Sequence, residues 1–182
     1  MELYAKGMFF LGENEKQKSY DCCIHGNIVF KIGDDLLSDS EEWCVSVSAY
    51  RFLHTLFKNH CMGAEEFLIP HCGHFMIPSE DAMSVSIIGC NIGIDFDILH
   101  EDGYVVIRTE ENTEYRVPYE EYKNAVVSFA EQIMEFYKSN PPREFEDAFD
   151  RDGYRAFVTE WRSLYEKAIS TEDGVPRGHC TF

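Results

Sequence analysis

The alternation of apolar and polar positions divides the chain into short strand-like stretches, followed by two long helix-like ones. In the first two-thirds, apolar and aromatic residues alternate with polar ones or form short runs bounded by glycine, which predicts β-strands. Asp102-Gly103 is a typical hairpin turn, so residues 94–117 are expected to form an antiparallel meander. The predicted strands cover residues 3–11, 26–33, 43–47, 84–89, 92–99, 104–109 and 114–117.

Three further stretches repeat their apolar residues with the 3.6-residue period of an α-helix. The first covers residues 48–60 and begins at Ser48, a residue type that commonly caps helices. The second covers 118–138, and its Pro118 suits a first helical turn because the N–H that proline lacks would be unpaired there. The third covers 151–168.

Each predicted helix has one apolar face, and a sheet needs a cover for its own apolar face. The pattern therefore predicts a single α+β domain over residues 1–170. In it, an antiparallel sheet made of the N-terminal strands and the 94–117 meander packs against the 48–60 helix and the two C-terminal helices. The polar stretch 171–182 contains glycine and proline, and is expected to be a flexible C-terminal tail.

The centre of the chain concentrates the residue types that carry chemistry. Residues 64–82 are predicted to be a long loop in which Pro70 and Pro78 bracket His71, Cys72 and His74. Loops of this length in a compact domain are often functional or contain unrecognised structure. In the strand that follows, Gly89 and Gly93 interrupt the apolar run, which indicates a bulge or a tight bend.

Imidazole and thiolate groups are the usual ligands of zinc, and two prolines would stiffen a loop that carries them. The candidate metal ligands are His71, Cys72, His74 and Cys90, and zinc is the possible cofactor. The spacing matches no standard zinc signature. The competing interpretation is a buried loop whose imidazoles bond to backbone carbonyls and whose thiol simply packs.

Two other arrangements of the same residue types remain open. Cys72 can be a nucleophile if His74 or His100 acts as its base and an aspartate, Asp95 or Asp97, orients that base. On a strand with alternating residues, however, this aspartate pair is expected to lie on the solvent-facing side. Separately, Cys22-Cys23-Ile24-His25 forms a second thiol-imidazole cluster, which either meets the first in space or is an ordinary loop that leads into a strand.

The charge of the chain narrows the choice of partners. Thirty-three acidic residues against 16 basic ones give a formal charge of −17, which disfavours direct binding of nucleic acid or of anionic lipid. The N-terminus lacks the pattern of a signal peptide, and no apolar run reaches the length of a membrane span. Seven irregularly spaced cysteines fit reduced thiols in the cytoplasm, most of them buried.

In size, charge and α+β character, the chain resembles small acidic bacterial cytosolic proteins, including immunity proteins that neutralise basic toxins. No sequence motif carries this resemblance, and it assigns no site residues. It implies a non-enzymatic protein that binds a basic protein partner. The alternatives are a zinc metalloprotein that uses the His71/Cys72/His74 loop and a small cysteine-dependent enzyme; the oligomeric state stays open.

Overall fold

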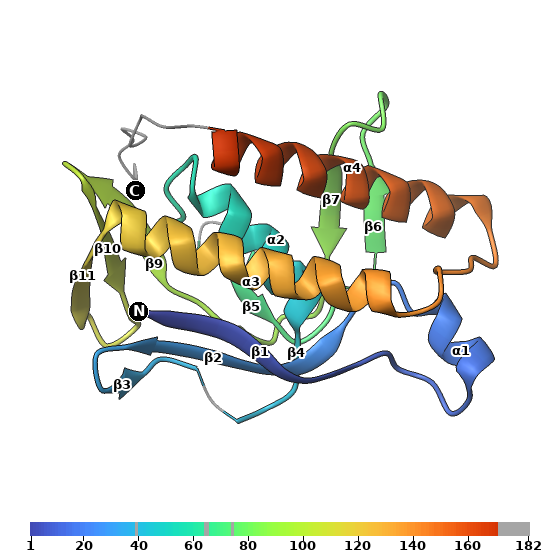
Figure 1. Ribbon diagram of the computed structural model, residues 1–182, viewed down its shortest axis with the longest axis horizontal. Helices are drawn as coiled ribbons and strands as arrows, with labels where there is room; N and C mark the ends of the chain where they lie inside the picture. The colour runs from blue at the N-terminus through green and yellow to red at the C-terminus, as the bar shows by residue number, and fades with distance from the viewer. Residues whose placement is uncertain (39, 64–65, 74, 171–182) are drawn as a thin grey trace.

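The computed structural model describes residues 1–38, 40–63, 66–73 and 75–170 (Figure 1). Its helices are α1 (Glu15–Tyr20), α2 (Val45–Thr55), α3 (Tyr119–Ser139) and α4 (Ala148–Ser170). Its strands are β1 (Glu2–Phe9), β2 (His25–Ile32), β3 (Asp35–Leu36), β4 (Trp43–Cys44), β5 (Ile69–Pro70), β6 (Phe75–Pro78), β7 (Val85–Ile88), β8 (Gly93–Ile94), β9 (Asp97–Glu101), β10 (Tyr104–Arg108) and β11 (Glu114–Pro118).

All described strand pairs are antiparallel, and the α+β class is confirmed. The described strands form four small sheets instead of the single sheet that the sequence suggested. One contains β1, β2 and β3, with β4 also paired to β2, and another is the predicted meander β9-β10-β11. The remaining two sheets are the two-stranded pairs β5-β8 and β6-β7.

The helices join these sheets into one body. Helix α2 lies at the centre and contacts both α3 and α4, while α3 covers β1 and α4 covers β6 and β7 (Figure 1). Aromatic rings connect the elements across the core; the ring of Phe30 in β2 meets Phe52 of α2 at 5.6 Å and Phe96 at 5.2 Å between centroids. Gln132 of α3 bonds to both the N–H and the carbonyl of Ala5, each at 2.8 Å, so the helix is also tied to the edge of β1.

The two C-terminal helices confirm the predicted stretches 118–138 and 151–168, with Pro118 at the N-cap of α3. The first helix begins and ends earlier than predicted, at Val45 and Thr55 instead of residues 48 and 60, and the expected strand 43–47 shrinks to the two residues of β4. Ser48 is not its cap, because the Ser48 hydroxyl bonds within the helix to the carbonyl of Cys44 at 3.0 Å. Helix α1 was not predicted; the Asn14 side chain caps it by accepting from the N–H of Gln17.

Two expectations are wrong: that Asp95 and Asp97 face solvent, and that all cysteines are reduced. Asp95 and Asp97 are only 3% and 8% exposed, not on a solvent-facing side. The chain between α2 and β5 folds over them and supplies partners, including the His60 ring for Asp95 at 2.8 Å and the N–H of Met62 for Asp97 at 2.7 Å. The cysteines are not all reduced either, because Cys61 is disulfide-bonded. The free thiols described are those of Cys22, Cys23, Cys44, Cys72 and Cys90.

Within the described part of the chain, no helix has the length and apolarity required to cross a membrane. The tail predicted over 171–182 lies outside the described residues.

Candidate functional site

The central stretch predicted as a loop is one arm of an interrupted β-hairpin. β5 pairs with β8 at the base of this hairpin, and β6 pairs with β7 towards its tip. The pairs Ile69↔Ile94 and Phe75↔Ile88 belong to the same register, so the two small sheets are aligned along one hairpin. The break in the second arm is therefore a local loss of pairing, and not a bulge with an extra residue, which was one of the two alternatives that the glycines indicated.

Glycines allow the two arms to approach closely where the ladder stops. A Cβ atom on Gly89 would collide with the carbonyl oxygen of Cys72, so a larger residue there would push the arms apart. On the other arm, a Cβ on Gly73 would lie 2.7 Å from a methyl group of Val47 in α2. The unpaired stretch is thus held between its own second arm and the start of the central helix.

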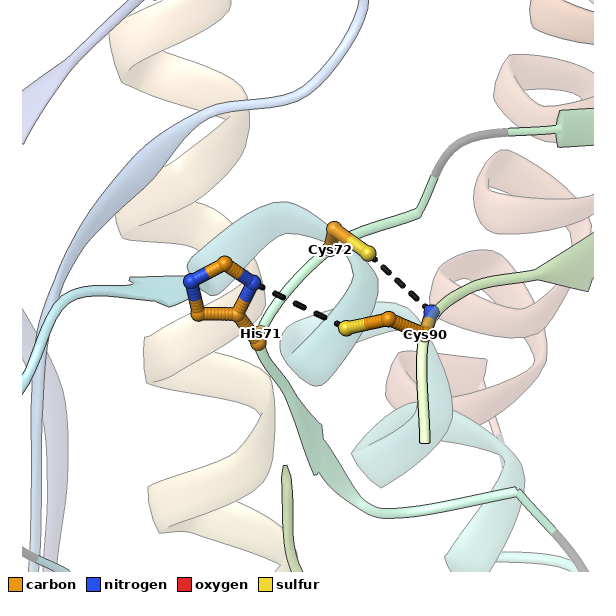
Figure 2. Close-up of side chains that lie close together, drawn as sticks. All are labelled: His71, Cys72 and Cys90. Atoms are coloured by element: carbon orange, nitrogen blue, oxygen red, sulfur yellow. Dashed lines mark hydrogen bonds between the residues drawn. The ribbon is translucent and has the colours of Figure 1, made fainter. Parts of the chain in front are cut away.

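Figure 2 shows that this stretch gathers His71, Cys72 and Cys90. The His71 Nδ1 atom lies 3.7 Å from the Cys90 sulfur, and the N–H of Cys90 donates to the Cys72 sulfur at 3.1 Å. One ligand atom from each of the three residues lies within 4.8 Å of the other two. Three of the four predicted ligands are therefore brought together, whereas the fourth, His74, lies outside the described residues.

The three side chains differ in their environments. Cys72 is buried, Cys90 is half-buried and His71 is exposed, so the cluster lies at the boundary between core and solvent. The buried ring of Trp43 meets the His71 imidazole edge to face, with 6.4 Å between centroids. Burial, followed by hydrogen bonding to the Cys90 thiol, raises the pKa of Cys72.

These distances suit a tetrahedral ion with soft ligands. With Zn–S bonds of roughly 2.3 Å and Zn–N bonds of roughly 2.0–2.1 Å, a sulfur and a nitrogen bound to the same zinc are about 3.6 Å apart. The 3.7 Å between His71 Nδ1 and Cys90 Sγ is close to that value. The Cys72 sulfur lies within 4.8 Å of both of these atoms.

The second thiol-imidazole cluster adjoins the first. Cys22, Cys23 and His25 share with Cys72 the wall of a cavity of about 210 Å³, and the Cys23 thiol donates to the carbonyl of Gly73 at 3.5 Å. Burial raises the pKa of Cys22 to about 12. The two cysteines lead into β2, as the loop interpretation predicts, and they also border a cavity that Cys72 lines.

The sequence pattern did not identify Cys44 as a member of this second cluster of thiols and imidazole. It precedes α2 directly, is fully buried and pairs with His25 across β4 and β2. Burial favours its neutral thiol, but a hydrogen bond with Cys23 and the nearby His25 outweigh it and lower the pKa to about 7. No sequence signal marked Cys44, because the pattern placed it in the predicted strand 43–47 and started the helix at Ser48.

The residues proposed as catalytic partners of Cys72 interact with other groups. His100 bonds through its ring to the carbonyl of Thr55 at 2.7 Å. Asp95 accepts from His60 and from the N–H of Leu68, and Asp97 contacts Arg108 at 3.2 Å. Among the described contacts, none joins His100 or either aspartate to Cys72.

Comparisons of the chain with known protein families, with curated proteins and with solved structures found no match.

Proposed function

We propose that the protein binds a zinc-type metal ion through His71, Cys72 and Cys90. The observation that carries the proposal is the convergence of one imidazole and two thiols within 4.8 Å, from two facing arms of a hairpin. The ligand types are those that zinc prefers, and each arm is held in place by neighbouring strand pairs.

Three protein ligands leave one position of a tetrahedral ion for water, a substrate or another side chain. This arrangement is typical of catalytic zinc sites, whereas structural sites have four protein ligands. The sequence prediction of His74 as a ligand stays a prediction. Because the ion must displace the protons of both thiols, its affinity should fall as the pH is lowered.

The test is metal analysis of untagged protein, followed by titration of the apoprotein with zinc and with cobalt. We expect about one ion per chain, and a cobalt spectrum with thiolate charge-transfer bands. Cys90→Ser should lower the affinity at least about tenfold, because one of the ligands is lost. Cys22→Ser is the matched control, since Cys22 is also a half-buried free thiol but lies outside the cluster.

The variant His74→Ala distinguishes a three-ligand site from a four-ligand site. Weakened binding in this variant would assign His74 to the ion, whereas unchanged binding would leave the position open to water. Less than about a tenth of an ion per chain in wild type, together with no response to added zinc or cobalt, would reject the metal site.

The second candidate function is binding of a basic protein, as the resemblance to immunity proteins implies. A groove of about 500 Å³ near β3 and the β10–β11 turn supports it, since five acids and no lysine or arginine occur among its described lining residues. These acids are Asp34, Asp35, Asp95, Glu110 and Glu111. A groove with this charge attracts cationic groups, and the −17 charge of the whole chain acts in the same direction.

Capture of proteins from the native lysate on immobilised protein tests this candidate. We expect basic proteins to be retained at about 0.05 M salt and released at about 0.5 M salt, because salt screens such contacts. A variant that neutralises Asp34, Glu110 and Glu111 should retain less. The matched control neutralises three exposed acids elsewhere, Glu13, Glu80 and Glu146. If the amount of captured protein does not depend on salt, or if both variants retain equally less, the groove is excluded as the docking site.

A further inference from the structure

Cys72 and Cys90 are also close enough to react with each other. Their sulfur atoms lie within 4.8 Å, and the N–H of Cys90 already points at the Cys72 sulfur. A disulfide requires a sulfur-sulfur bond of about 2.05 Å, so the two sulfurs must approach further, by rotation of their side chains and movement of the unpaired arms. No described backbone hydrogen bond joins residues 72–73 to 89–91, so closing the bond would break none of the described ladder.

Both cysteines border space that a small reagent can enter. Cys72 lines the 210 Å³ cavity, and Cys90 is half-buried at the surface of the hairpin. Cys44, in contrast, is fully buried and does not line that cavity. A small oxidant therefore meets the Cys72–Cys90 pair before it meets the thiol at the start of α2.

We propose that Cys72 and Cys90 form a redox-active dithiol, whose substrate is a low-molecular-weight disulfide of the glutathione type. One thiolate attacks a sulfur of this disulfide, forms a mixed disulfide and releases one thiol. The second cysteine then attacks the protein sulfur of that mixed disulfide, closes the Cys72–Cys90 bond and releases the second thiol. The two cysteines lose two electrons and two protons, and the small disulfide gains both.

Disulfide formation between Cys72 and Cys90 does not require a metal ion. The effect of that disulfide on a bound ion, however, rests on the proposed function. A disulfide removes both thiolate ligands at once and leaves only His71 of the three. The ion keeps its charge, because the two electrons come from the sulfurs. Oxidation should therefore release about one ion for each disulfide formed, and reduction should restore binding.

The first arm of the test uses apoprotein prepared with a chelator and equilibrated in glutathione redox buffers of increasing oxidised fraction. Thiols are then alkylated and counted by intact mass, and the linked peptides are mapped. We expect two thiols to disappear together, with Cys72 linked to Cys90. Cys90→Ser should instead leave Cys72 joined to glutathione, whereas Cys22→Ser should behave as wild type. Circular dichroism confirms that both variants are folded.

The second arm uses zinc-loaded protein and a chromogenic chelator to follow release. If zinc never binds, the first arm still decides the dithiol, so failure of the metal site and failure of the dithiol are distinguishable. Separate, stable glutathione adducts on Cys72 and Cys90, or a link from Cys72 to Cys22 or Cys23 across the cavity, would overturn the proposal.

Discussion

Gly153 of α4 lies directly against the main-chain carbonyl of Met76 in β6, in a position where a Cβ atom would collide with the carbonyl oxygen. This contact sets the distance between the C-terminal helix and the outer part of the site hairpin. The glycine is needed for close approach, although glycine inside a helix usually lowers stability by up to about 1 kcal/mol relative to alanine.

Gly153→Ala should therefore destabilise the protein, against the usual trend for helices. We expect a loss of about 1–3 kcal/mol in the free energy of unfolding, because the added methyl group forces the helix away from β6. Urea denaturation followed by circular dichroism measures it. Arg155→Ala, at an exposed position of the same helix, is the control and should stay within about 0.5 kcal/mol of wild type. A stabilised Gly153→Ala variant would show that the contact is not tight.

The buried carboxylate of Asp95 is expected to be a major stabilising group. It accepts from the His60 ring at 2.8 Å and from the N–H of Leu68 at 3.1 Å, and thereby fixes the chain that precedes the hairpin. Asp95→Ala should cost about 2–5 kcal/mol, because it leaves two buried hydrogen-bonding partners, the His60 ring and the N–H of Leu68, without their acceptor. Asp95→Asn keeps an acceptor oxygen and should cost less. Equal costs for the two variants would mean that packing, and not hydrogen bonding, dominates.

Two histidines should give opposite pH dependences of stability. Burial lowers the pKa of His100, although a bond to the carbonyl of Thr55 opposes this. The unfolded chain then binds its proton more readily, so His100 weakens the fold as the pH falls from about 6.5 through its lowered pKa. For His25, burial also lowers the pKa, but Asp21 and Cys44 together raise it by more. The contribution of His25 to the stability of the fold is therefore fully present below about pH 6.5, and it is lost as the pH rises through the raised pKa of His25.

Unfolding midpoints of wild type, His100→Gln and His25→Gln, measured from about pH 5 to about pH 8, separate these effects. The stability of wild type relative to His100→Gln should decrease on acidification. Relative to His25→Gln, it should increase over the same range. Parallel curves for all three proteins would mean that neither histidine changes its pKa on folding.

Gly89→Ala should impair both proposed activities of the Cys72–Cys90 pair. The new methyl group would collide with the Cys72 carbonyl and push the two arms of the hairpin apart. We expect zinc affinity to fall at least about tenfold, and the yield of the Cys72–Cys90 disulfide to fall with it. Asn91→Ala, at an exposed position two residues further on, is the control for the same segment. An unaffected Gly89→Ala variant would show that the arms can shift without loss of the site.

Much of the secondary structure followed from local periodicity. The meander, β1, β2 and the two C-terminal helices have strong patterns and clear turn or cap residues, such as Asp102-Gly103 and Pro118. The first arm of the site hairpin lacks such a pattern, because β5 and β6 are only two and four residues long and contain prolines. Tertiary pairing with β8 and β7 makes them strands, and no local pattern contains that information.

The candidate site was only partly accessible from sequence. The concentration of His71, Cys72 and Cys90 identified the residue types, but their meeting depends on the hairpin register. The position of Cys44 depends on where α2 begins, which the pattern placed three residues too late. Asp95 was misplaced because its partner His60 was predicted to lie at the end of the 48–60 helix, whereas α2 ends at Thr55.

The shared register of the two halves of the hairpin has a consequence for length variation in this chain. The tip, residues 79–84, is mostly exposed and lies beyond the last strand pair, so added or deleted residues there would leave the alignment of both arms intact. One residue gained or lost between Pro70 and Phe75 would shift Cys72 relative to Cys90 and separate the sulfurs. Chains that share this site should therefore vary in length at the tip and keep the spacing of the arms fixed.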